Sequence, residues 1–149
     1  WKMEGLEDNV FAIMKQSETG VVASLHSTMT QWRHLFSLEV FLESGYMVLN
    51  GLKTGSGTYG DEVLTVAKNR STAPAATWDD EELFRFETDN SWNYEAEHFL
   101  NAISNDEPVQ IGTSRDALEV MELIEAIYEN ERHESKELNT TLKKIRGKS

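Results

Sequence analysis

Three glycines in the middle of the chain, Gly55, Gly57 and Gly60, have the spacing G-x-G-x-x-G that is typical of dinucleotide-binding turns. Such a turn binds a pyrophosphate because a strand leads into it and a helix begins directly after it, so that the first N–H groups of the helix point at the phosphates. Residues 46–51 before the glycines (YMVLNG) have the composition of a strand. Residues 62–69 after them (EVLTVAKN) contain the run Val-Leu-Thr-Val, which favours a second strand rather than a helix. We therefore predict a flexible hairpin loop at the glycines and no dinucleotide site.

The histidines, which are common metal ligands and proton carriers, do not form a recognisable set. His26, His34, His98 and His133 include no pair at i and i+4 of one helix, and no carboxylate lies beside them at zinc-site spacing. The chain has no cysteine, which excludes thiolate metal sites and cysteine nucleophiles. The sequence also lacks a G-x-S-x-G motif, a P-loop and a carboxylate pair spaced for acid–base catalysis. We predict neither a metal site nor a self-contained catalytic site.

His26 is the most informative histidine because it lies within a predicted strand, residues 21–29. The odd positions of this strand are mostly apolar, and the even positions include Ser24, His26 and Thr28, with Trp32 farther along the same side. Such a row is either a solvated or dimer-buried sheet face, which we favour, or a ligand surface on which an indole stacks against a sugar ring. The residues that we expect to contact a ligand, by binding and stacking rather than proton transfer, are His26, Trp32, Arg33 and Tyr59, the last from the glycine loop.

The composition is that of a folded domain that repels polyanions. The 149 residues suffice for one domain with a core, and 39% hydrophobic and 27% charged residues are ordinary for a globular chain. With 26 acidic against 14 basic side chains the formal net charge is −12, so we expect no nucleic-acid partner. No apolar run approaches the roughly 18 residues of a membrane span and no signal peptide is recognisable, so we expect a cytoplasmic protein. The chain enters a strand-like run soon after Trp1, and we expect it to be part of a longer protein.

Six segments in the first part of the chain have the alternation, or the β-branched and aromatic content, of strands. They are residues 9–16, 21–29, 34–43, 46–51, 62–69 and 82–88. Short turn signals separate most of them, which favours a mainly antiparallel sheet. One side of the third segment carries Phe36, Leu38, Val40 and Leu42, which predicts an apolar sheet face.

The apolar period becomes helical in the second half. Residues 91–105 carry one apolar stripe, and Thr113 and Asp116 form a capping box before a second amphipathic helix that has an acidic outer face. Two amphipathic helices and a sheet with one apolar face can bury each other's apolar surface. We therefore predict a two-layer α+β fold, with a mainly antiparallel, open-faced sheet of about six strands and two or more helices packed on one face.

Four segments follow one another in an order that is fairly specific. They are the strand GVVASLHS, the hairpin WRHLFSLEVFLESG, the helix EHFLNAI and the helix ALEVMELIEAIY. Together they resemble the C-terminal domain of the Gfo/Idh/MocA oxidoreductases, the glucose-fructose oxidoreductase and inositol dehydrogenase family. The resemblance covers residues 6–131.

The resemblance implies that residues 1–149 are a single C-terminal substrate and assembly domain, preceded in the full-length protein by a Rossmann domain that binds NAD or NADP. It implies hydride transfer between nicotinamide and a hydroxyl or carbonyl carbon of a sugar or cyclitol. It also implies that this domain shapes the substrate pocket and forms a homo-oligomer through its open sheet face. Leu35 and Phe41 are the apolar anchors that we expect on that face.

The chain departs from the family in what it lacks. It has no N-terminal β-α-β unit, no E-K-P segment with the family's active-site lysine and no D-x-G-x-H segment with its catalytic histidine. No catalytic or cofactor-binding residue can be carried over, so we expect this chain alone to bind no cofactor and to be inactive. The tail, residues 131–149, either extends the last helix or forms a strand at KELNTTL. An alternative of another class is a stand-alone acidic α+β binding or scaffold domain that uses its sheet face for a protein partner.

Overall fold

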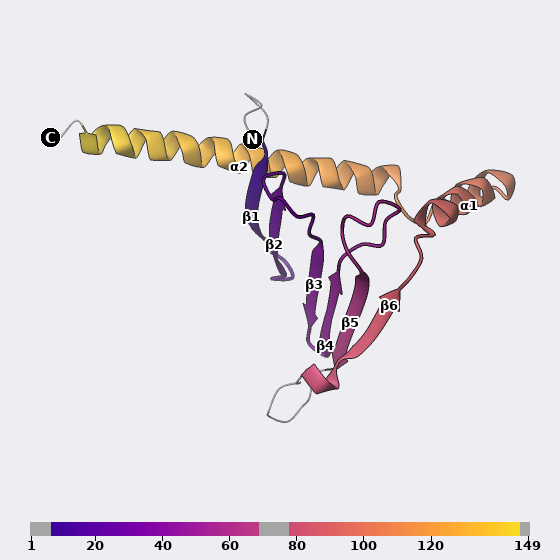
Figure 1. The fold of residues 1–149 in the computed structure, drawn as a ribbon. Coiled ribbons are helices and arrows are strands. Elements are labelled where there is room, and N and C mark those ends of the chain that lie inside the picture. Colours follow the sequence, from indigo (N-terminus) through magenta and orange to yellow (C-terminus); the bar gives the residue numbers. More distant parts are fainter. Residues whose placement is uncertain (1–6, 69–77, 147–149) are drawn as a thin grey trace. The chain divides into compact units, whose positions relative to one another are not determined.

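The computed structural model describes residues 7–68 and 78–146, with side chains as far as residue 136. These residues form six strands and two α-helices (Figure 1), and the strand pairing is antiparallel, so the predicted α+β class with about six strands is confirmed. The strands form two sheets, one of two strands and one of four, rather than one sheet of six. The chain divides into two compact units, one of Trp1–Val10 with Ser27–Ala96 and the other of Phe11–His26 with Glu97–Ser149.

The first sheet is a hairpin of β1 (Asn9–Lys15) and β2 (Val22–Thr28). Its register follows from two backbone hydrogen bonds, from Gln16 N to Val21 O at 2.9 Å and from Met29 N to Asp8 O at 2.8 Å. These bonds place Phe11 opposite His26 in a pair that shares no backbone hydrogen bond, where side chains come closest. The predicted turn between the two strands is therefore present.

The second sheet has the strand order β3 (Ser37–Leu42), β4 (Gly45–Asn50), β5 (Glu62–Lys68) and β6 (Glu82–Phe86). Its register aligns one residue of each strand into an apolar row, Leu38–Leu49–Leu64–Phe84. A neighbouring row of Val40, Met47 and Val66 lies on the same face because side chains two positions apart share a face. The predicted apolar face is thus continuous over all four strands.

Both helices begin with local capping. In α1 (Ser91–Ser104) the Asp89 carboxylate accepts hydrogen bonds from Ser91 N and Ser91 Oγ. In α2 (Ser114–Arg146) the predicted capping box is confirmed, since Thr113 N donates to Asp116 Oδ2 at 2.9 Å and Asp116 N donates to Thr113 Oγ1 at 3.1 Å. The tail continues α2 as far as Arg146, so a strand at residues 136–142 is wrong. The packing of the helices on a sheet face stays a prediction.

Gly51 provides a test of the register of β4 and β5. It has φ of +72°, and a Cβ built on it would overlap the carbonyl oxygen of Asp61, whereas Gly57 has φ of +64° with no heavy atom within 4 Å of such a Cβ. We expect Gly57→Ala to lower the free energy of unfolding by about 1–2 kcal/mol, the cost of a left-handed alanine. We expect Gly51→Ala to cost about 2 kcal/mol more because the overlap adds to that strain. Urea unfolding of the two variants measures this, and equal losses would contradict the register.

Candidate functional site

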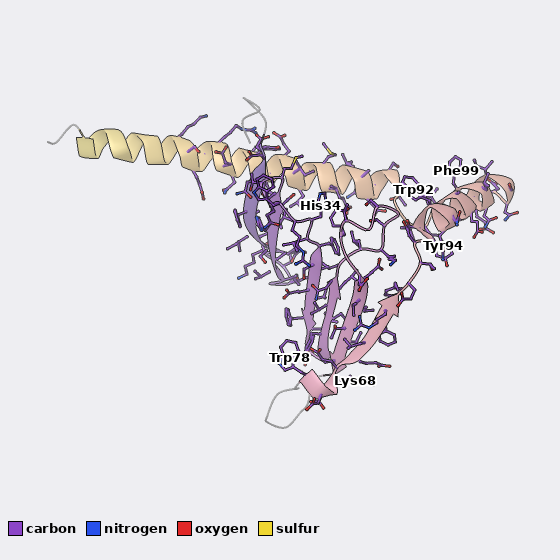
Figure 2. The ribbon with its side chains drawn as sticks, viewed as in Figure 1. His34, Lys68, Trp78, Trp92, Tyr94 and Phe99 are labelled. Atoms are coloured by element: carbon purple, nitrogen blue, oxygen red, sulfur yellow. The ribbon has the colours of Figure 1, made fainter. Side chains whose placement is uncertain are left out.

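Three connections meet at one end of the four-stranded sheet, which we call the loop end. They are residues 29–36 before β3, residues 51–61 between β4 and β5, and residues 87–90 after β6. Antiparallel register brings them together, since Asn50 pairs with both Ser37 and Val63, and Glu62 pairs with Phe86. Figure 2 shows His34 at this end of the sheet and Trp78 and Lys68 at the opposite end.

The glycine motif lies in the loop that connects two neighbouring antiparallel strands. No helix follows it, because β5 begins at Glu62 and pairs with β4. Two of its glycine N–H groups are used within the loop: Gly57 N donates to Thr54 O at 2.9 Å and Gly60 N donates to Gly57 O at 3.4 Å. Both glycines have positive φ, which is their ordinary use in a tight loop. The predicted hairpin loop at the glycines is confirmed, and the absence of a dinucleotide site stays a prediction.

Tyr59, predicted to contact a ligand, lies in this loop against His34. The ring centroids are 5.1 Å apart at an interplanar angle of 90°, an edge-to-face contact that is favourable for aromatic rings. The tyrosine is half-buried and the histidine is exposed. The sequence alone does not identify His34 as a binding residue. Only the strand register brings the connection that contains it, residues 29–36, beside the glycine loop.

Two carboxylates fix the backbone of the loop end, and sequence analysis missed both. Asp89 accepts hydrogen bonds from Ser91 Oγ at 2.6 Å and Ser91 N at 3.1 Å. These bonds, with a further contribution from the Gly55 N–H, hold the pKa of Asp89 below its ordinary value. Glu62 Oε2 accepts a hydrogen bond from Lys53 N at 2.7 Å across the base of the loop. The sequence signal for Asp89 is its place just before a helix start, where short acidic side chains are favoured.

Trp32 and Arg33 lie in the connection that leads to β3, and Trp32 is 92% exposed. We predicted that Trp32 continues the strand face of His26, and this is wrong because β2 ends at Thr28. Beyond Thr28 the backbone bonds to a side chain of its own segment. Thr30 N donates to the Thr28 hydroxyl at 3.0 Å, and the two threonine hydroxyls lie 2.8 Å apart. Leu35 likewise precedes β3 rather than lying on its face, whereas Phe41 is within β3.

His26 stacks on Phe11 across the hairpin, with ring centroids 4.0 Å apart and an interplanar angle of 9°. The face that we predicted to be polar therefore also carries apolar residues of β1, Phe11 and Ile13, which are 72% and 85% exposed. The four predicted binding residues are divided between the two units. Trp32, Arg33 and Tyr59 belong to the unit of the loop end, and His26 belongs to the other.

Two searches of the described residues bear on the class of site. Within residues 7–68 and 78–136, no group of three or more acidic or histidine side chains is arranged to hold a metal ion. In the same part of the chain, no helix combines the length and the apolar character that crossing a bilayer requires.

Comparison with known proteins gives no family assignment. No protein-family model matches the chain, and neither the curated proteins nor the solved structures contain a significant match.

The contact between His34 and Tyr59 can be measured with a double-mutant cycle. We expect His34→Ala and Tyr59→Leu to be coupled by about 0.5–1.5 kcal/mol in the free energy of unfolding, as edge-to-face ring pairs are. The cycle of Phe41 with Tyr46, whose rings lie 5.9 Å apart on the sheet itself, is the matched comparison. Coupling within error of zero between His34 and Tyr59 would contradict the arrangement of the loop end.

Proposed function

We propose that this chain is the C-terminal substrate and assembly domain of a cytoplasmic NAD(P)-dependent oxidoreductase that acts on a sugar or cyclitol. The proposal is supported by the resemblance of residues 6–131 to the Gfo/Idh/MocA C-terminal domain and by an α+β fold in which the expected elements follow in the expected order. The observation on which it rests is the contact of His34 with Tyr59 at the loop end, since Trp32 and Arg33 belong to the same connection as His34.

The residue types of the loop end suit a polyhydroxylated ring. An exposed indole such as Trp32 can stack on the C–H face of a sugar, while the Arg33 guanidinium donates hydrogen bonds to ring hydroxyls. His34, whose ring contacts Tyr59, can also donate or accept a hydrogen bond to a ring hydroxyl. These groups bind and orient a substrate. The nicotinamide of the cofactor domain would supply the hydride chemistry.

A second candidate, the acidic binding or scaffold domain, is favoured by the apolar surface of the four-stranded sheet. Phe41 and Leu42, on opposite faces of β3, are 70% and 60% exposed, and Ala67 is the one buried side chain among the residues whose burial the structure describes. Apolar surface of this extent is typical of a face that another polypeptide covers. In the oxidoreductase proposal, a second copy of the chain covers exposed apolar surface of the sheet in a homo-oligomer that forms through the open sheet face.

The two proposals differ in what accompanies the chain. We expect a protein that includes the coding sequence upstream of Trp1 to bind NAD(P)H and to oxidise a neutral sugar or cyclitol, and residues 1–149 alone to be inactive. In the longer protein, Trp32→Ala should raise KM roughly fivefold to tenfold with little change in kcat, because stacking holds substrate and transition state alike.

Trp78→Ala is the matched control, since Trp78 is a similarly exposed tryptophan, 87%, at the opposite end of the sheet. It should leave KM unchanged. A longer protein that binds no NAD(P)H would overturn the oxidoreductase proposal and leave the scaffold domain, and equal effects of the two substitutions would remove the loop end as the substrate site.

A further inference from the structure

Helix α2 carries an apolar stripe that is open to solvent in its first half. It is a single helix of 33 residues (Figure 1), and Met121, Ile124 and Tyr128 recur along it at intervals of three and four residues, so they lie on one face. Met121 is 60% exposed, Ile124 is 38% exposed and Tyr128 is half-buried. The stripe is therefore an apolar face that the described part of the chain covers only in part.

The same stripe returns in the last turns of α2. Leu138, Leu142 and Ile145 stand in the sequence at the continuation of the three-and-four spacing, and the backbone is helical as far as Arg146. Apolar residues at this spacing are typical of the seam of a coiled coil. Residues 129–137, between the two apolar segments, are polar without exception. The stripe thus consists of two apolar segments on one face of the helix, separated by a polar centre.

The polar centre of the stripe indicates the direction in which a second helix would lie. Glu131 and Ser135 occupy the two stripe positions of this centre, and the Ser135 hydroxyl donates a hydrogen bond to Glu131 Oε1 at 2.9 Å. In a parallel pair of α2 helices, Glu131 of each copy would face the same carboxylate of the other, which places like charges together at the seam. In an antiparallel pair, Glu131 of each copy can face Ser135 of the other, a hydroxyl that can donate to it. The polar centre therefore favours an antiparallel pair.

The two halves of α2 carry opposite charge. Residues 114–131 contain six carboxylates and one cation, a net charge of −5. Residues 132–146 contain two carboxylates and five cations, a net charge of +3. Parallel copies would place like charge beside like charge along the whole helix, whereas antiparallel copies place the acidic half of each beside the basic half of the other. This charge complementarity matches α2 to a second copy of itself.

We propose that α2 is an interaction surface for a second copy of this chain, with which it pairs as an antiparallel two-stranded coiled coil. The register that places Glu131 of each copy opposite Ser135 of the other also places Ile124 opposite Leu142. At 1.5 Å per residue, the paired segment from residue 121 to residue 145 is about 36 Å long. The inference goes beyond the proposed function, because it needs neither a substrate nor a cofactor domain and uses a helix rather than the open sheet face.

The test measures the dimer dissociation constant of residues 1–149 by sedimentation equilibrium, with Ile124→Lys and Leu142→Glu as separate variants. We expect the unaltered chain to dimerise and each variant to dimerise at least about tenfold more weakly, because its homodimer places two unpaired charges at the seam. Mixing the two variants should restore association. In the antiparallel mixed dimer, one layer keeps Ile124 opposite Leu142, and the other pairs the introduced lysine with the introduced glutamate.

Leu118→Lys is the matched control, since Leu118 is 50% exposed on α2 but lies outside the stripe. It should leave the dissociation constant unchanged. If mixing the two seam variants restores nothing, the antiparallel register is overturned. A dimer that all the α2 variants leave unchanged and that Phe41→Glu abolishes would overturn the inference and leave a homo-oligomer through the sheet face. A chain that stays monomeric at about 100 μM, far above the dissociation constants of stable dimers, would overturn both interfaces.

Discussion

The antiparallel pairing of β4 with β5 is the constraint on which the rest of the described sheet depends. It decides that the intervening glycines close a loop between neighbouring strands rather than lead into a helix. The same pairing, carried over to β3 and β6, aligns the apolar row from Leu38 to Phe84 on one face. It also brings three connections to one end of the sheet, where His34 contacts Tyr59. The four-stranded sheet, its apolar face and the arrangement of the loop end thus follow from its antiparallel register.

The glycine spacing shows why a short motif has to be judged with the elements around it. Gly55, Gly57 and Gly60 match the letters of a dinucleotide-binding turn, yet a cofactor site also requires a helix start whose N–H groups are available. Here the loop N–H groups of Gly57 and Gly60 bond to backbone carbonyls, and the nearby start of α1 is capped by Asp89. An internal carboxylate at a helix start is stabilising for the same electrostatic reason that a bound phosphate would be. The chain uses its acidic residues where a nucleotide-binding protein would place its ligand.

Local patterns in the sequence predict most of the secondary structure, because strand alternation and capping are short-range effects. The six strands, the start of α1 and the Thr113–Asp116 box are all of this kind. The alternation of apolar and polar residues did not predict the end of β2 at Thr28. The hydroxyls of Thr28 and Thr30 bond to each other there, and Trp32 lies beyond the strand rather than on the face of His26. The division into two sheets likewise depends on hydrogen bonds between distant segments. For the candidate site, residue type identified Tyr59, and the place of Asp89 just before a helix start is a local signal for that carboxylate, whereas the contact of His34 with Tyr59 required the register.

The central claim is that the glycine loop closes a hairpin between β4 and β5, with the N–H groups of Gly57 and Gly60 bonded to carbonyls of the loop, and is not a dinucleotide-binding turn. An NMR titration of the isotope-labelled chain with NADH tests this claim most directly, because it observes the amides of Gly55, Gly57 and Gly60 individually. The account predicts that these three resonances do not move at millimolar NADH. Saturable shifts of the three amides, abolished by Gly57→Val, would contradict it and restore the loop as a dinucleotide site.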